Sequence, residues 1–131
     1  MTFTSAHAAA LWSGLLLILM VVLSVRVVGQ RRKHRVTVGD AGAPELMQAV
    51  RAFGNAAEYV PAGIGALAIL AHVDPPAFVT HVTGLALFAG RVIHAIALSR
   101  TTGTSLGRAA GMMLTWVAYL FAAVALLFYS L

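Results

Sequence analysis

The stretch RAFGNAAEYVP, residues 51–61, places the polar side chains of Arg51, Asn55 and Glu58 in a segment otherwise apolar enough to cross a membrane. At 3.6 residues per turn, positions i, i+4 and i+7 lie on one face of a helix. Ionisable groups are costly inside a bilayer, so they normally face protein, water or a ligand. This polar face is therefore the first candidate for a functional site.

The composition is that of an integral membrane protein. The chain has 131 residues, of which 60% are hydrophobic and only 10% are charged. Soluble domains usually have about 25% charged residues. The sequence contains no cysteine, which excludes disulfides, thiolate metal sites and cysteine nucleophiles.

Four segments reach the roughly 20 mainly apolar residues that a spanning helix needs. They cover residues 8–28, 45–71, 77–98 and 106–131, approximately. The first ten residues contain no Lys or Arg, so the first segment is expected to be a retained helix rather than a signal peptide. The sequence thus predicts an all-α protein, an integral membrane four-helix bundle forming a single domain over residues 1–131.

The basic residues predict the orientation of these helices. The loop at 29–44 carries four Lys or Arg residues, the loop at 72–76 carries none, and Arg100 lies in the loop at 99–105. By the positive-inside rule, the first and third loops are cytoplasmic and both termini lie on the non-cytoplasmic side. The net charge of +5 is therefore interpreted as a topology signal and not as a nucleic-acid footprint. Binding of anionic lipid or ligand by residues 31–35 is the alternative for the basic run.

Two arginines on different helices reach a similar depth. Arg51 lies about six residues past the start of its helix, roughly 9 Å deep at 1.5 Å per residue. Arg91 lies about seven residues before the end of the third helix, roughly 10 Å deep, and His94 shares its face. These side chains, with Asn55 and Glu58, predict a cationic pocket near the cytoplasmic side for a small ligand with several carboxylates.

Ion pairing without a ligand is the alternative for the same residues. Arg51 and Glu58 would then pair within one helix, or Glu58 would pair with Arg91 across two helices. The histidines are scattered along the chain, so no metal site is expected.

Two motifs resemble the MAPEG family, the membrane-associated proteins in eicosanoid and glutathione metabolism. The family's Arg-Ala-x-x-Asn-x-x-Glu pattern, ending near a proline, and its Gly-Arg-Val-x-His pattern both have counterparts here. The first is matched by Arg51, Ala52, Asn55, Glu58 and Pro61, and the second by Gly90, Arg91, Val92 and His94. The segment at 35–42 looks most like the small bacterial branch of the family, which implies a location in the bacterial inner membrane.

The resemblance implies a homotrimer that holds glutathione between neighbouring subunits near the cytoplasmic side. It implies a glutathione-dependent transferase or peroxidase acting on lipophilic electrophiles that dissolve among the membrane lipids. Arg108 is the nearest match to the family's catalytic arginine, which stabilises the glutathione thiolate. The residues expected to bind or support glutathione are Arg51, Asn55, Glu58, Arg91 and His94.

Three positions depart from the prostaglandin-forming members. Gly54 stands where they have a further arginine, Leu98 replaces a tyrosine, and Ala109 replaces a serine. A non-catalytic MAPEG-like protein that binds lipid or glutathione is therefore the main alternative function. A proton-coupled multidrug exporter is disfavoured, because the arginines around Glu58 would repel cationic drugs.

Overall fold

The computed structural model describes residues 4–101 and 103–131, and within these ranges the only regular elements are four α-helices. All four are long and apolar enough to span a membrane. The expected all-α membrane bundle is confirmed. The helices are α1 (Ser5–His34), α2 (Pro44–Val73), α3 (Ala77–Arg100) and α4 (Leu106–Tyr129).

The first helix is longer than the sequence predicted. It continues for six residues beyond residue 28, through the basic run, and ends at His34. Arg, Lys and Gln are good helix formers, and cations are favourable near a helix C-terminus. The helix ends because Arg35 adopts a left-handed conformation, with φ 54°. The loop expected at 29–44 is therefore shorter and spans residues 35–43.

Local signals in the sequence explain most of the other helix ends. The Oγ atoms of Thr4 and Ser105 accept hydrogen bonds from the backbone N–H groups of His7 and Arg108, so both residues act as N-caps. Pro44 occupies the first turn of α2, where its missing N–H costs nothing. Asp74, with φ 49°, ends α2 in the left-handed region.

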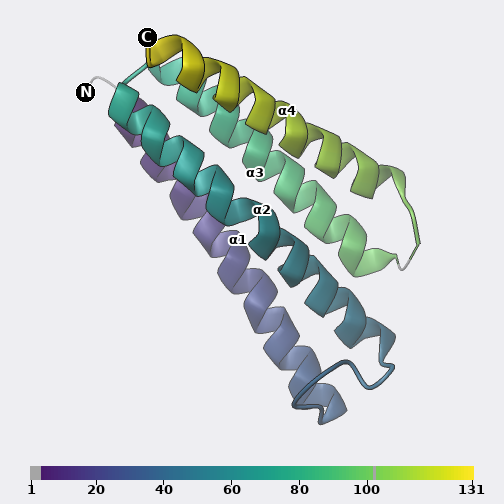
Figure 1. The fold of residues 1–131 in the computed structure, drawn as a ribbon. Helices are drawn as coiled ribbons and strands as arrows, with labels where there is room; N and C mark the ends of the chain where they lie inside the picture. Colours follow the sequence, from purple (N-terminus) through teal and green to yellow (C-terminus); the bar gives the residue numbers. More distant parts are fainter. Residues whose placement is uncertain (1–3, 102) are drawn as a thin grey trace.

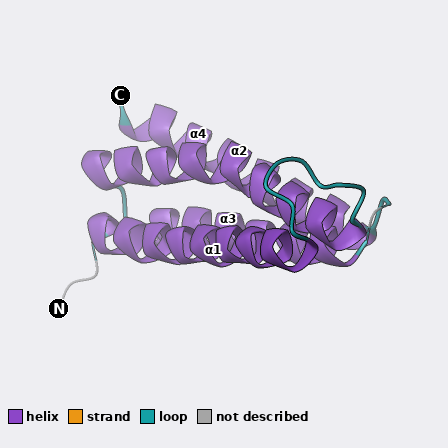
Figure 2. Cartoon of the chain, turned by 90° about the horizontal axis from the view of Figure 1, so that it is seen from below, coloured by secondary structure: helices purple, strands orange, loops and turns teal. Residues whose placement is uncertain are grey.

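The helices form two layers, with α2 and α4 in one and α1 and α3 in the other (Figures 1 and 2). The first helix packs on α2 and α3, the last packs on α3 and α2, and α1 and α4 do not contact each other over their described residues. The first helix begins and the last helix ends at the same end of the bundle (Figure 1). We call this the terminal end, and the opposite end, which carries the loops 35–43 and 101–105, the basic end.

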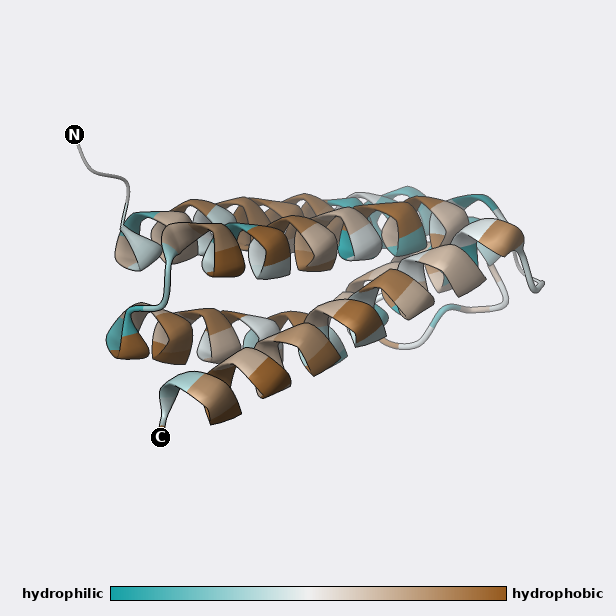
Figure 3. Ribbon diagram, turned by 90° about the horizontal axis from the view of Figure 1, so that it is seen from above, coloured by the Kyte–Doolittle hydropathy of each residue, from teal (hydrophilic) through white to brown (hydrophobic). Residues whose placement is uncertain are grey.

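Polarity is distributed unevenly between these ends. All nine Lys and Arg residues lie in the half of the bundle nearer the basic end. Figure 3 shows hydrophilic colours on the helices of that half and mainly hydrophobic colours along the other. The fold therefore gathers every Lys and Arg toward one end of the bundle.

Glycine allows the backbones of α3 and α4 to approach each other closely. A Cβ atom added at Gly111 would lie 2.6 Å from the backbone N of His94 and 2.7 Å from the backbone O of Gly90. Small residues at membrane helix interfaces permit this approach of two backbones. The contact matters for the site because Gly90 and His94 flank Arg91.

Candidate functional site

Arg91 lies at the centre of the basic half and is the largest fully buried side chain of the described chain, with 1% of its surface exposed. Its Nε donates to Oγ1 of Thr115 on α4 at 2.9 Å, and its Nη1 donates to Oδ1 of Asn55 on α2 at 2.7 Å. Its Nη2 lies 3.4 Å from the carbonyl oxygen of Gly111 and 3.5 Å from Sδ of Met112. One side chain of α3 therefore links α2 and α4.

The aromatic ring of Tyr59 also lies over this guanidinium. Its Cζ lies 4.9 Å from the ring centroid of Tyr59, within the range of a cation–π contact. Tyr119 packs against Tyr59 with ring centroids 6.2 Å apart, and its hydroxyl donates to the Tyr59 carbonyl. Neutral oxygens, the Met112 sulfur and the Tyr59 ring thus surround the guanidinium, and no carboxylate of residues 4–101 or 103–131 pairs with it. The expected alternative pair between Glu58 and Arg91 is not formed.

The polar face of α2 lies on the outside of the same half. A surface hollow of about 290 Å³ is lined by Arg51, Gly54, Asn55 and Glu58. The Arg51 and Glu58 side chains are exposed, and neither makes a hydrogen bond or ion pair with another residue that the structure describes. The alternative pair within α2 is therefore not formed either, and both charges are available to a partner.

Asn55 connects the buried and exposed groups. Its Oδ1 accepts the hydrogen bond from Arg91, while its side chain also lines the hollow beside Arg51 and Glu58. The two motifs of the sequence, one on α2 and one on α3, meet at this hydrogen bond. The arrangement holds a buried cation directly behind a surface site.

Comparison with known proteins agrees with these two motifs. A model of the MAPEG family matches residues 9–128. The chain belongs to the MAPEG family. It is also 34% identical over 121 residues, 92% of this chain and 91% of the relative, to the inner membrane protein YecN of Escherichia coli K12. The same values hold for YecN of Escherichia coli O6:H1.

His94, the last residue of the second motif, lies about one turn closer to the basic end than Arg91 and contacts Arg108. His94 is 8% exposed, and its Nδ1 lies 2.9 Å from the backbone carbonyl oxygen of Arg108. A carbonyl oxygen can only accept, so Nδ1 donates, which fixes the ring. The half-buried Arg108 side chain donates from Nη1 to the carbonyl of Gly103 in the α3–α4 loop. The backbone carbonyl of Arg108 therefore accepts the hydrogen bond from His94, while the Arg108 guanidinium donates a hydrogen bond to the α3–α4 loop.

The three departures from the prostaglandin-forming MAPEG proteins have different surroundings. Gly54 lines the hollow, and an added Cβ there would meet nothing within 4 Å. Leu98 is buried in the core, with 4% of its surface exposed, whereas Ala109 is exposed. The glycine thus leaves the hollow open, and the leucine has a packing role.

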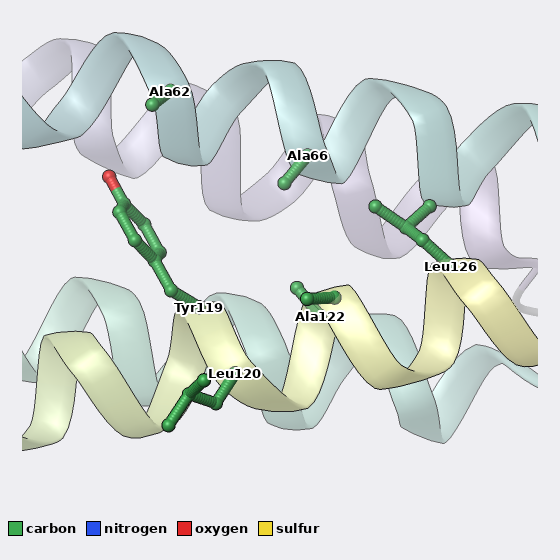
Figure 4. A pocket seen from close by; sticks show the side chains of 7 residues that line it. Ala62, Ala66, Tyr119, Leu120, Ala122 and Leu126 are labelled. Carbon is green, nitrogen blue, oxygen red and sulfur yellow. The ribbon is translucent and has the colours of Figure 1, made fainter.

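An apolar groove of about 370 Å³ runs between α2 and α4 on the terminal side of Tyr119 (Figure 4). Its walls are mainly alanine, and Figure 4 shows Ala62 and Ala66 facing the α4 side chains across it. Ala62 follows Glu58 by one helical turn. The groove therefore begins where the polar hollow ends. Its lining residues are Ala62, Ala66, Tyr119, Leu120, Ala122, Ala123 and Leu126.

The sequence missed Tyr59, Thr115 and Tyr119 as parts of this site. Thr115 is a polar residue in an apolar helix, four positions after Gly111, and this was the available signal. Its contact with Arg91 depends on how α4 is rotated about its axis, which hydropathy does not reveal.

Proposed function

We propose that this MAPEG protein binds glutathione in the hollow of α2 and acts as a transferase or peroxidase, in which the glutathione sulfur attacks lipophilic electrophiles in the membrane. The observation that carries the proposal is the exposed pair Arg51 and Glu58, with Asn55 between them and the buried cation of Arg91 behind it. Glutathione has two carboxylates, one amine and one thiol. An arginine fork suits a carboxylate, and Glu58 suits the amine.

A second copy of the chain would complete this site. Arg51 and Glu58 face outward from a membrane-spanning helix, where contact with hydrocarbon would be costly. The same exposed side of α2 continues to Gly65, whose small size suits close packing against another helix. These features favour a homo-oligomer, and the family favours a trimer with the ligand between subunits.

The membrane arrangement follows the charges. The gathering of basic residues at one end supports a cytoplasmic basic end, with both termini on the opposite side. The relatives are named as inner membrane proteins, which supports the same membrane for this chain. The hollow would then take glutathione from the cytoplasm, while the α2–α4 groove seats the apolar part of a substrate arriving from the lipid.

The chemistry needs only a stabilised thiolate. A free thiol has a pKa of about 8.5, and a nearby cation favours its anion. In the transferase reaction, the sulfur attacks an electrophilic carbon, a C–S bond forms, and the leaving group departs with its electron pair. In the peroxidase reaction, the thiolate attacks the terminal oxygen of a lipid hydroperoxide. An S–O bond forms, the O–O bond breaks, and the alkoxide takes up a proton and leaves as the alcohol. The thiol of a second glutathione then attacks the sulfur of this sulfenic acid and displaces water, which yields the disulfide. Arg108 is the proposed catalytic cation, and His94 positions its backbone.

Calorimetry on the detergent-purified protein tests the binding site. Glutathione should bind at millimolar concentration or below, and Arg51→Ala or Glu58→Ala should each weaken it about tenfold or more, as expected for hydrogen bonds to charged groups. Arg100→Ala is the matched control, because it removes an exposed arginine at the same end outside the hollow. An absence of binding at millimolar glutathione, or equal losses in the control, would rule out the site.

A non-catalytic binding protein is the second candidate. The observation favouring it is the hydrogen bond from Arg108 to the Gly103 carbonyl, which directs that guanidinium to the loop. Turnover of chlorodinitrobenzene with glutathione separates the two functions. Catalysis predicts measurable turnover that Arg108→Ala abolishes while glutathione still binds. Binding without turnover, unchanged by Arg108→Ala, would identify the non-catalytic protein.

A further inference from the structure

A second basic hollow forms where α1 ends and the chain turns back. Arg35, with φ 54°, reverses the chain after the last turn of α1. Nη1 of Arg31 then donates to the carbonyls of Thr37 and Gly39, at 3.1 and 3.0 Å. These bonds hold the start of the α1–α2 loop against the helix and give the hollow a fixed wall.

The arginines of this hollow carry uncompensated positive charge. The hollow has a volume of about 440 Å³ and is lined by Val28, Arg31, Arg32, Arg35, Val36 and Thr37. The exposed side chains of Arg32 and Arg35 make no hydrogen bond or ion pair with any other residue in 4–101 or 103–131. The two acidic residues that flank them in sequence are engaged elsewhere. Asp40 accepts from the N–H of Gly42, and Glu45 lies 3.6 Å from His34.

An exposed aliphatic stripe leads from the membrane interior to this hollow. Ile18, Val21, Val25 and Val28 are 61%, 62%, 64% and 44% exposed, and their spacing of three, four and three places them on one face of α1. Arg32 follows Val28 by four residues, so it continues the same face about 6 Å further along the axis. The stripe and the hollow therefore meet at the expected boundary between hydrocarbon and headgroups.

We propose that this hollow binds the phosphate of an anionic phospholipid, whose acyl chains lie along the stripe on α1. Arginine forks bind phosphate oxygens through parallel hydrogen bonds. Anionic headgroups also attract basic segments beside a membrane. A topology signal requires only the positive charge. The bonds from Arg31 to the loop, the hollow and the adjoining stripe are further features that fit a seated lipid. A soluble phosphate has the same charge but makes no use of the stripe.

Native mass spectrometry with phosphatidylglycerol and phosphatidylcholine tests this site. The protein should retain phosphatidylglycerol in preference to phosphatidylcholine, and Arg32→Gln/Arg35→Gln should weaken that retention about tenfold or more. Lys33→Gln/Arg100→Gln is the matched control. It removes the same charge from the same end, at exposed residues that do not line the hollow, and should change retention little. Circular dichroism establishes that both double variants keep their helices.

Two results would overturn the proposal. Equal loss of phosphatidylglycerol in both double variants would show a general effect of charge without a site. Displacement of the lipid by equimolar glycerophosphoglycerol or inorganic phosphate would show an anion site that does not recognise acyl chains. Retention that survives these competitors but is lost in Arg32→Gln/Arg35→Gln supports a lipid site.

Discussion

The two halves of the bundle satisfy their polar groups in different ways. In the terminal half, the buried and half-buried polar side chains form hydrogen bonds within one chain. Ser5 Oγ lies 2.5 Å from Thr80 Oγ1 and 3.3 Å from the Leu70 carbonyl, and Trp12 Nε1 donates to Nδ1 of His81 at 3.1 Å. In the basic half, a cation is buried without a carboxylate, and Arg51 and Glu58 face outward.

The two halves therefore have different roles, one in holding the helices together and one in binding a ligand. A hydrogen bond between neutral side chains fixes the positions of the helices and leaves no group that needs a ligand. Unpaired charges on the outside of a spanning helix cost free energy in the bilayer, and no contact within a single chain offsets that cost. The basic half therefore carries the site, and the terminal half holds the helices that position it. Substitutions at three positions test this comparison.

Arg91→Ala should have the largest effect on stability. It removes the donors to Asn55 and Thr115 and leaves a cavity among three helices, so we expect a loss of about 3 kcal/mol, within the range for emptying a buried site. Denaturant titration in detergent, followed by circular dichroism, measures it.

Arg91→Met separates the two causes, because methionine refills part of the volume without any donor. A methionine variant as stable as the parent would mean that the hydrogen bonds of Arg91 add nothing to the fold. The buried cation of the basic half would then contribute to ligand binding alone and not to the stability of the fold.

Gly111→Ala should have an intermediate effect. The new Cβ would meet the backbone of His94 and Gly90, so α3 and α4 must separate. We expect a loss of about 1–3 kcal/mol, as for other overpacked cores. Gly14→Ala is the control, since an added Cβ there meets nothing within 4 Å. Equal thermal stability of the two variants would contradict the close approach.

Thr80→Val should have the smallest effect. It removes the hydrogen bond to Ser5, but Ser5 keeps the Leu70 carbonyl as an acceptor. Hydrogen bonds between membrane helices contribute about 0.6 kcal/mol on average. The same denaturant titration should show a loss of this size, with glutathione binding unchanged. A weakened glutathione affinity would show that the terminal half also shapes the site.

Much of this protein was predictable from sequence patterns with a physical cause. Apolar segments gave the four spanning helices, since every backbone polar group must be satisfied inside a bilayer. The motifs around Asn55 and Arg91 indicated the family and the pair of helices that meet. The end of α1 was missed because hydropathy falls at Val28, while helix propensity remains high up to Arg35.

The candidate site was predictable only in part. Periodicity places Arg51, Asn55 and Glu58 on one face of α2, and the same rule places His94 near Arg91 on α3. It does not say how far each helix is rotated about its axis, so it left open which groups are buried. The aromatic cover from Tyr59 and Tyr119 depends on that rotation too.

The sequence by itself determined the membrane class, the helix number, the family and the collection of basic residues near one end. These follow from composition and from local periodicity, which need no knowledge of neighbouring helices. Only the tertiary structure decided that Arg91 lies inside the bundle while Arg51 and Glu58 face out, with Asn55 shared between them. Packing placed Arg91 there, because Gly90 and Gly111 let α3 and α4 approach closely enough for one arginine of α3 to bond both α2 and α4.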